Sequence, residues 1–226
     1  HTRTRRQRQM CIRDSAYTSI VGGGANGCIL HYIENKDMLK NGDLVLIDAG
    51  CEYEDYASDI TRTFPVNGKF SDEQAAIYDI VLKALKEAID VTQAGTPYNK
   101  TNETTIRVIT EGLVELGLLK GDINDLIKAE AHREFYMHGA GHWLGLDVHD
   151  VGDYKIDGEW RIYEPGMVVT IEPGIYISPK NKKVDTKWRG IGVRIEDDIV
   201  ITKTGNINLT SKVPKERNEI EKMMAK

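Results

Sequence analysis

The sequence is poor in cysteine, lacks a long apolar run and has no excess of positive charge. Three cysteines among 226 residues show no paired spacing, which argues against a disulfide framework and favours a reducing compartment, so we expect a cytoplasmic protein. The best apolar stretch, Met167–Ile171, falls far short of the roughly 18 residues that a membrane span needs. The formal charge of −5 at pH 7 argues against nucleic-acid binding through a general basic field.

The composition that remains is ordinary for a globular protein, with 40% hydrophobic and 29% charged residues. The length suits one large domain or two small ones. No internal repeat or low-complexity tract is present. Collagen, coiled coils, membrane proteins and disulfide-stabilised mini-proteins are therefore excluded as classes.

The first 15 residues differ in charge from the rest of the chain. They hold five arginines and one aspartate, whereas the remaining residues carry 25 basic and 34 acidic side chains, a net charge of −9. A basic arm or a transit peptide would explain such a segment. However, Arg5–Ser15 (RRQRQMCIRDS) resembles the translated read-through of an adapter used in transposase-based sequencing libraries. We therefore predict that residues 1–15 are non-native, that the domain covers residues 16–226, and that a natural N-terminal part is missing.

The region after this segment carries strand signals. Val21–Gly24 is typical of a loop, and Cys28–Tyr32 (CILHY) predicts a short strand. Leu44–Ile47 is an apolar run that predicts a buried strand. Tyr56–Phe64 alternates in polarity and predicts a second strand, paired with the first as a hairpin.

The middle of the chain reads as helical and the later part as strand-rich. Ser71 opens a capping box with Gln74, and the apolar spacing that follows predicts an amphipathic helix ending near Gly95. Further helices are predicted at residues 102–116, at 122–131 and from Pro214 onward, and further strands at 167–171, 175–178 and 191–201. Because paired strands flank a helical middle, the predicted fold class is α+β.

Two aspartates stand where the hairpin strands would favour apolar residues. If the hairpin turns about Tyr53 and Glu54, Asp48 and Asp59 lie directly opposite each other, with Cβ atoms about 5 Å apart. Carboxylates that close repel each other, so one takes up a proton unless a cation lies between them. The alternative is an exposed hairpin with two solvated aspartates.

A glycine-rich stretch, HGAGHWLGLDVHD, contains three of the six histidines of the chain: His138, His142 and His149. The spacing of His138 and His142 would suit a zinc-binding helix, but no glutamate follows His138, and Gly139 and Gly141 disfavour a helix. A strand or loop that presents separate imidazoles fits better.

Two glutamates also lie in apolar surroundings. Glu172 follows an apolar strand, and Glu196 shares a predicted strand face with Arg194 and Asp198. An exposed, salt-bridged face is the alternative, above all for Asp198. With Asp48 and Asp59, the glutamates supply four negative charges, which two divalent cations would balance. Oxygen-rich ligands with one imidazole favour Mn, Fe, Co or Zn, and no cysteine is needed.

The chain from about Tyr17 to Met224 resembles the catalytic domain of the Xaa-Pro aminopeptidases (aminopeptidase P). These belong to the pita-bread metallopeptidases, with prolidase, methionine aminopeptidase and creatinase. The resemblance rests on five segments: NGCILHY, LIDAGCEYEDYASDITRTFPVNGKF, HGAGHWLGLDVHD, EPGMVVTIEPGIYI and RGIGVRIEDDIVIT. It implies a pita-bread catalytic domain with two divalent ions, Mn²⁺ being expected and Co²⁺, Fe²⁺ or Zn²⁺ the alternatives.

The resemblance also implies a role for each candidate residue. The five expected metal ligands are Asp48, Asp59, His142, Glu172 and Glu196. His31 and His149 are expected to contact substrate and assist the tetrahedral intermediate, and His138 to form a wall of the pocket for the proline ring. Arg194 is expected to support the ligand glutamate from outside the ligand set.

The implied activity is release of the N-terminal residue from peptides with proline in second position. A metal-bridging hydroxide would attack the Xaa-Pro bond, and Glu172 would pass the proton to the leaving nitrogen. Prolidase, which cleaves only Xaa-Pro dipeptides, and a non-catalytic pita-bread binding module are the alternatives. We expect peptide substrates, no nucleic-acid or membrane partner, and a homo-oligomeric parent protein.

Two features depart from the family pattern. Ala140 replaces a larger aliphatic residue, but it neither ligates nor titrates. In the family, the catalytic domain begins well before the segment with His31, and a separate N-terminal domain precedes the catalytic domain. We therefore expect residues 16–226 alone to be impaired in folding or activity.

Overall fold

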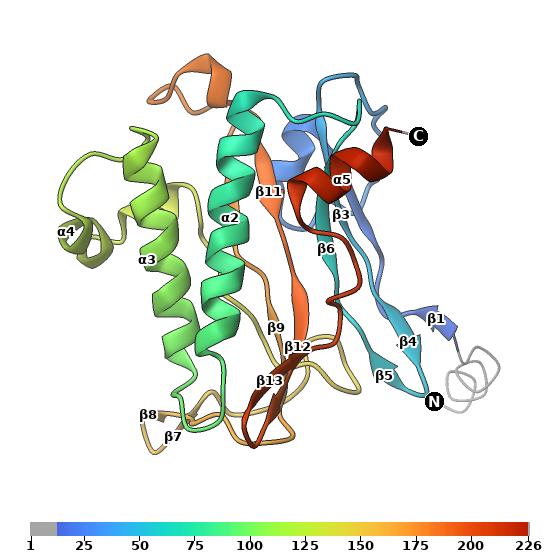
Figure 1. Ribbon diagram of the computed structural model, residues 1–226, viewed down its shortest axis with the longest axis vertical. Coiled ribbons are helices and arrows are strands. Elements are labelled where there is room, and N and C mark those ends of the chain that lie inside the picture. The colour runs from blue at the N-terminus through green and yellow to red at the C-terminus, as the bar shows by residue number, and fades with distance from the viewer. Residues whose placement is uncertain (1–12, 226) are drawn as a thin grey trace.

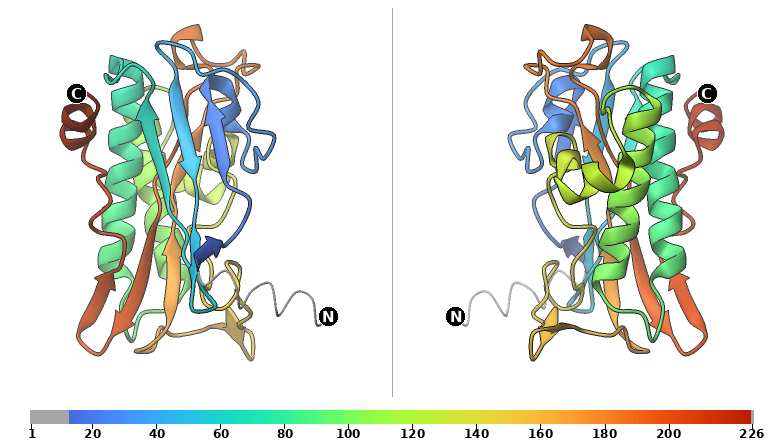
Figure 2. Two further views of the ribbon diagram at one scale, coloured as in Figure 1. Left: turned by 90° about the vertical axis from the view of Figure 1, so that its right-hand side faces the viewer. Right: turned by 90° about the vertical axis from the view of Figure 1, so that its left-hand side faces the viewer.

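The computed structural model describes residues 13–225. A layer of helices covers one side of a layer of strands (Figures 1 and 2). Helices α2 (Asp72–Val91) and α3 (Asn99–Glu115) lie side by side, and the C-terminal helix α5 (Arg217–Met224) lies beside α2.

The first half of the chain forms a three-stranded antiparallel sheet. Strand β3 (Leu44–Asp48) lies between β2 (Ile20–Gly23) and β6 (Thr61–Pro65). A smaller sheet continues it at one end, formed by β1 (Arg13–Ser15), β4 (Cys51–Tyr53) and β5 (Tyr56–Ala57).

The second half forms the other strands. β12 (Asp197–Thr202) lies between β13 (Gly205–Asn208) and β9 (Val168–Ile171), and β10 (Gly174–Tyr176) pairs with β11 (Gly192–Arg194). A short hairpin joins β7 (Lys155–Ile156) to β8 (Glu159–Trp160). The remaining elements are α4 (Ile123–Lys128) and three 3-10 helices at Gly24–Cys28, Ala131–Glu134 and Thr186–Trp188. β11 contacts both β3 and β6, so the strands of the two halves meet there.

The predicted amphipathic helix is confirmed as α2. The Ser71 hydroxyl accepts from the backbone of Gln74, and the Gln74 side chain accepts from the backbone of Ser71, which completes the capping box. Ile77, Val81 and Leu85 are fully buried in the main core, against side chains of the second half. The α+β class is confirmed, although α3 begins three residues before the predicted start and the helix expected at 122–131 ends at Lys128.

The strand predicted at Cys28–Tyr32 is wrong. The strand is instead β2, which overlaps the segment Val21–Gly24 that we predicted to be a loop, and Gly24–Cys28 forms a 3-10 helix against it. A Cβ atom at Gly22 would lie 2.9 Å from the carbonyl oxygen of Asn26, so the missing side chain allows this close approach. The glycines that suggested a loop here instead allow strand β2 to pack closely against the 3-10 helix that follows it.

The predicted hairpin is present but turns one residue later than expected. Glu54 and Asp55 occupy the turn with φ values of 50° and 70°, and two consecutive positive φ values match the twist of a two-residue hairpin. Asp48 therefore pairs with Thr61 and not with Asp59. The register prediction was wrong by two residues.

The alternating run at 191–201 is not one strand with one exposed face. The chain leaves β11 at Arg194 and enters β12 at Asp197, and every residue from Gly192 to Ile199 is buried. Both faces of this part of the sheet are covered, because α2 contacts β9 and β11 on one side and β6 contacts β11 on the other.

The hypothesis that residues 1–15 are non-native falls largely on residues 1–12, which lie outside the described residues, and it stays a prediction. Within residues 13–225, no helix combines the length and apolar character that crossing a membrane requires.

Candidate metal centre

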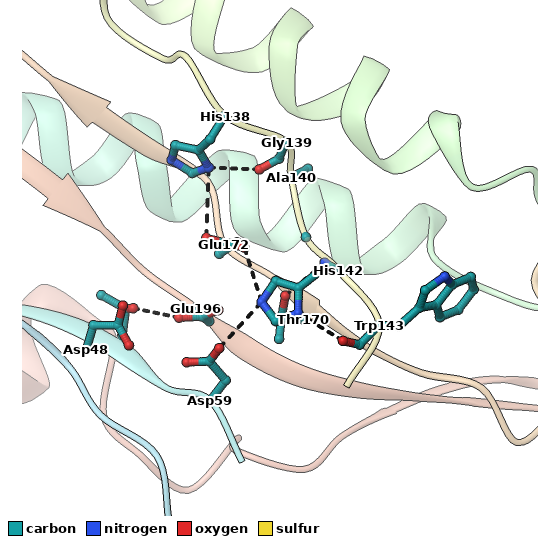
Figure 3. A network of polar contacts seen from close by, with 12 residues as sticks. Asp48, Asp59, His138, Gly139, Ala140, His142, Trp143, Thr170, Glu172 and Glu196 are labelled. Carbon is teal, nitrogen blue, oxygen red and sulfur yellow. Dashed lines mark hydrogen bonds and ion pairs between the residues drawn. The ribbon is translucent and has the colours of Figure 1, made fainter. Parts of the chain in front are cut away.

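The five predicted ligands converge on one cavity of about 290 Å³. Asp48 ends β3, Asp59 lies in the break between β5 and β6, His142 lies in the loop before β9, Glu172 follows β9, and Glu196 lies between β11 and β12. Figure 3 shows their side chains turned toward a common space. Residues up to 148 positions apart in the sequence therefore meet where the strands of the two halves meet.

Asp48 and Asp59 meet despite the shifted register, and they share a partner that the sequence analysis missed. The hydroxyl of Tyr17 lies 2.5 Å from Oδ1 of Asp48 and 2.5 Å from Oδ1 of Asp59. Burial and the two carboxylates together raise the pKa of Tyr17, so it stays a neutral donor. Tyr17 stands alone before β2, and no pattern in the sequence marks it.

Asp59, His142 and Glu196 are the most compact part of the cluster. Each offers one ligand atom, and these three atoms lie within 4.8 Å of one another. Nε2 of His142 lies 3.4 Å from Oδ2 of Asp59 and 3.6 Å from Oε1 of Glu172. The other ring nitrogen, Nδ1, donates to the carbonyl oxygen of Trp143 at 3.0 Å, so Nε2 faces the carboxylates. Although burial opposes it, the hydrogen bond to Asp59 and the charge of Glu172 raise the pKa of His142.

The carboxyl groups are buried close to one another, and this disfavours their charged forms. Burial raises the pKa of Glu172 to about 7, against the opposing effect of His142. The pKa of Glu196 is raised well above its ordinary value by burial and then by Glu172 and Asp59. Burial also raises the pKa of Asp48. Four carboxyl groups and one imidazole nitrogen lie together here with too little positive charge nearby to balance the carboxylates. Such a set of ligand atoms fits a divalent cation.

Arg194 is the buried guanidinium of the site. Nη2 donates to Oδ2 of Asp48 at 2.6 Å, and Nε donates to the hydroxyl of Thr61 at 3.1 Å. The Thr61 hydroxyl in turn donates to Oε2 of Glu196 at 2.6 Å. The resemblance implies that Arg194 supports the ligand glutamate; in the structure its direct contact is Asp48, and it reaches Glu196 through Thr61.

The remaining candidate histidines, His31, His138 and His149, all line the same cavity. The ring of His149 lies 4.3 Å from that of His142, edge to face, and its pKa is lowered by burial and by His142. Nε2 of His138 lies 2.8 Å from the Tyr176 hydroxyl, and burial lowers the pKa of His138 to about 4. His138 is therefore uncharged at neutral pH.

Asp198 corrects the expectation of an exposed, salt-bridged face. It is 3% exposed, and its Oδ2 accepts from the backbone N–H of Asp59 at 3.2 Å. Glu196, for which the same alternative stood, is also buried, and its backbone N–H donates to the Thr61 carbonyl at 3.0 Å. Asp59 and Thr61, just before and at the start of β6, supply these partners, so polar residues there are not signs of exposure.

Comparison with known proteins gives consistent results. A family model for metallopeptidase family M24 matches residues 1–203. The chain is 58% identical over 214 residues to a Xaa-Pro aminopeptidase of Haemophilus influenzae, covering 95% of the chain and 49% of that protein. Among solved structures, the Pseudomonas aeruginosa aminopeptidase PepP matches with a TM-score of 0.93 at 61% identity, covering 94% of the chain and 48% of that one. Proline aminopeptidase P II from Yersinia pestis matches with a TM-score of 0.91 at 60% identity, covering the same shares.

The chain thus spans about half the length of the curated relatives it matches. Its fold is the pita-bread α+β catalytic domain, and the convergent acidic groups and His142 form a possible metal site within it. This chain belongs to metallopeptidase family M24.

Proposed function

We propose that this chain carries the catalytic centre of a metallo-aminopeptidase that releases the N-terminal residue from peptides with proline in second position. The observation that carries the proposal is the convergence of four carboxyl groups and one imidazole in a single cavity. The relatives named Xaa-Pro aminopeptidase support the choice of substrate.

In this proposal two divalent ions, Mn²⁺ in the first place, are held by Asp48, Asp59, His142, Glu172 and Glu196. Four carboxylates balance the charge of two such ions, and the raised pKa values of the metal-free cluster indicate that it lacks positive charge. When bound, the ions would lower the pKa of a coordinated water and polarise the scissile carbonyl.

The side chains of the chain have distinct tasks around the scissile bond. Glu172, which lines the cavity beside His142, takes up a proton from the attacking water and passes it to the leaving proline nitrogen. His31 and His149 donate hydrogen bonds to the substrate and to the developing oxyanion, work that supplies roughly 3–4 kcal/mol for a well-placed donor. Neutral His138 forms an uncharged wall for the proline ring. Arg194 holds Asp48 in place through its 2.6 Å hydrogen bond.

The test is hydrolysis of Arg-Pro-Pro beside Ala-Pro, with and without added Mn²⁺. The assay uses this chain and, in parallel, the same chain within a protein of the length of its relatives. Mn²⁺-dependent release of arginine from Arg-Pro-Pro is the expected result. Cleavage confined to Ala-Pro would instead identify a prolidase, and Mn²⁺ binding without hydrolysis of either peptide would favour a binding module.

Two matched variants link this activity to the site. Asp59→Asn removes a ligand charge, whereas Asp55→Asn removes a charge from the exposed turn of the same hairpin, where asparagine tolerates the positive φ. We expect the first variant to lose activity and Mn²⁺ binding together and the second to keep both. Equal effects of the two variants would contradict the assignment of Asp59 as a ligand.

We also propose a cytoplasmic location and a homo-oligomeric parent protein. Cys28 and Cys51 are both free thiols, Cys51 being exposed, which suits a reducing compartment. Light scattering on the protein of relatives' length measures the oligomeric state directly, and a monomer would refute that part of the proposal.

A further inference from the structure

Behind the metal centre lies a buried arginine whose five N–H groups all have acceptors. Arg62 is 2% exposed. Nε donates to the carbonyl of Pro214 at 3.1 Å, Nη1 to those of Thr61 at 2.9 Å and Glu196 at 2.5 Å, and Nη2 to that of Val213 at 3.0 Å and to Oδ1 of Asp197 at 2.7 Å. The side chain of Arg62, on β6, thus binds the backbone of β6, of the link between β11 and β12, and of the C-terminal segment.

The partner carboxylate, Asp197, is fully buried and accepts four hydrogen bonds. Arg62 and the Thr210 hydroxyl donate to Oδ1, and Asn208 and Lys215 donate to Oδ2, each at 2.7 Å. Arg62, Lys215 and Asn208 keep the pKa of Asp197 below its ordinary value despite its burial. We call these residues, Arg62, Asp197, Asn208, Thr210 and Lys215, the Arg62–Asp197 cluster.

The cluster holds the backbone from which metal ligands project. Arg62 bridges the carbonyls of Thr61 and Glu196, and the Thr61 hydroxyl fixes the Glu196 carboxyl group at 2.6 Å. On the other side of Asp197, the Thr210 hydroxyl accepts from the backbone N–H of Asp198 at 3.1 Å. Asp198 in turn accepts from the backbone N–H of Asp59, so the cluster reaches both ligand-bearing segments.

Three members of the cluster come from outside the segment that the M24 family model matches. The match ends at residue 203, whereas Asn208, Thr210 and Lys215 lie beyond it. The end of β13 and the segment after it therefore supply three of the four donors to the carboxylate next to Glu196.

A buried ion pair of this kind contributes little net stability compared with apolar side chains of the same volume, because desolvation opposes the attraction. What it does supply is direction, since a guanidinium that donates to five acceptors and a carboxylate that accepts from four donors favour one arrangement of the backbone. That property is useful beside a site where carboxyl oxygens must meet within a few ångströms.

We propose that Arg62, Asp197 and Lys215 are positioning residues of the metal centre. They fix the backbone from which Glu196 and Asp59 project their carboxyl groups, and they touch neither ion nor substrate. The inference rests on the metal site proposed above and extends it to the C-terminal segment.

The test compares Lys215→Met with Lys212→Met. Lys215 donates to Asp197 and is 15% exposed, whereas Lys212 is exposed and, within residues 13–225, forms no ion pair, so the same change there is the matched control. Mn²⁺ affinity is measured by calorimetry on metal-free protein, Co²⁺ coordination by visible absorption, and stability by thermal unfolding in EDTA. We expect Lys215→Met to bind Mn²⁺ about 10–100-fold more weakly and to alter the Co²⁺ spectrum. Lys212→Met should match the unaltered chain. Lys215→Arg keeps a charged donor at this position and should also match the unaltered chain in Mn²⁺ affinity and in the Co²⁺ spectrum.

Two results overturn the inference, and they are distinguishable. If Lys215→Met lowers the unfolding temperature in EDTA but binds Mn²⁺ as tightly as the unaltered chain, with the same Co²⁺ spectrum, the cluster is structural only. All variants are tested within a protein of the length of the relatives; if the unaltered sequence there binds no Mn²⁺, the metal site fails and the inference fails with it. Thr210→Val removes a second donor without removing a charge and is measured in the same way, so the outcome does not depend on one variant.

Discussion

Removal of divalent ions leaves the partly buried carboxyl group of Glu172 beside other acidic groups, and its pKa predicts how the stability of the metal-free protein responds to pH. Burial raises that pKa from 4.5 to about 7. Between these values the folded protein holds a proton that the unfolded chain has released. The free energy of unfolding is therefore highest below pH 4.5 and falls as the pH rises through 7.

The size of this effect follows from the shift. A shift of this size corresponds to about 3 kcal/mol, since one pKa unit is worth about 1.4 kcal/mol. For a domain of this length, each kcal/mol changes the Tm by about 2–4 °C, so Glu172 alone accounts for about 6–12 °C. The raised pKa values of Glu196 and Asp48 act in the same direction, whereas His138, whose pKa is lowered to about 4, acts in the opposite direction below pH 6.5.

Glu172→Gln isolates the contribution of one carboxyl group from this background. Gln has the same shape and no titration, so the difference in Tm between the two proteins cancels the effect of His138. In EDTA, the variant should gain about 6–12 °C on the unaltered chain between pH 4.5 and pH 8. Circular dichroism melts at the two pH values measure this. A Tm difference that is the same at both pH values would refute the reasoning.

Added Mn²⁺ should reverse the pH dependence of the unaltered chain, because the ions bind the deprotonated carboxylates and compete with protons. The Tm should then rise with pH over the same range. In Glu172→Gln the neutral amide replaces the carboxylate and binds the ions more weakly, so the Tm of this variant should rise less with pH. A Tm that does not respond to Mn²⁺ at pH 8 would contradict the assignment of Glu172 as a ligand.

The parts of the fold that the sequence predicted are those determined by local interactions. The capping box at Ser71 and the apolar spacing after it specify α2 without reference to any other element. Asp48 and Glu172 could be identified as candidates because each follows an apolar strand, a position that a carboxyl group occupies at a cost unless it has a task.

What the sequence could not provide depends on contacts between distant residues. The hairpin register follows from positive φ at Glu54 and Asp55, and an acidic pair is not a usual signal for that turn. Tyr17 and Arg62 are single polar residues whose partners lie far along the chain, so no spacing identifies them. Asp198 follows the alternation typical of an exposed strand face, yet it is buried and its carboxylate accepts from the backbone of Asp59, far along the chain.

The remaining predictions concern the roles of three polar side chains. His149→Ala should keep its Mn²⁺ content and lower kcat by on the order of 10²-fold, because an oxyanion donor is lost and no ligand is; a metal-free variant would show that this histidine is a ligand. Asp59→Ala should lose Mn²⁺ and activity together, and retention of both would exclude it from the ligand set. Tyr17→Phe should weaken Mn²⁺ binding about 10–100-fold, since its hydroxyl is held 2.5 Å from Oδ1 of both Asp48 and Asp59 and without it each carboxyl group is free to rotate away from the other. Calorimetry with Mn²⁺ measures this affinity, and a value equal to that of the unaltered chain would mean that the strands alone hold the two aspartates in place.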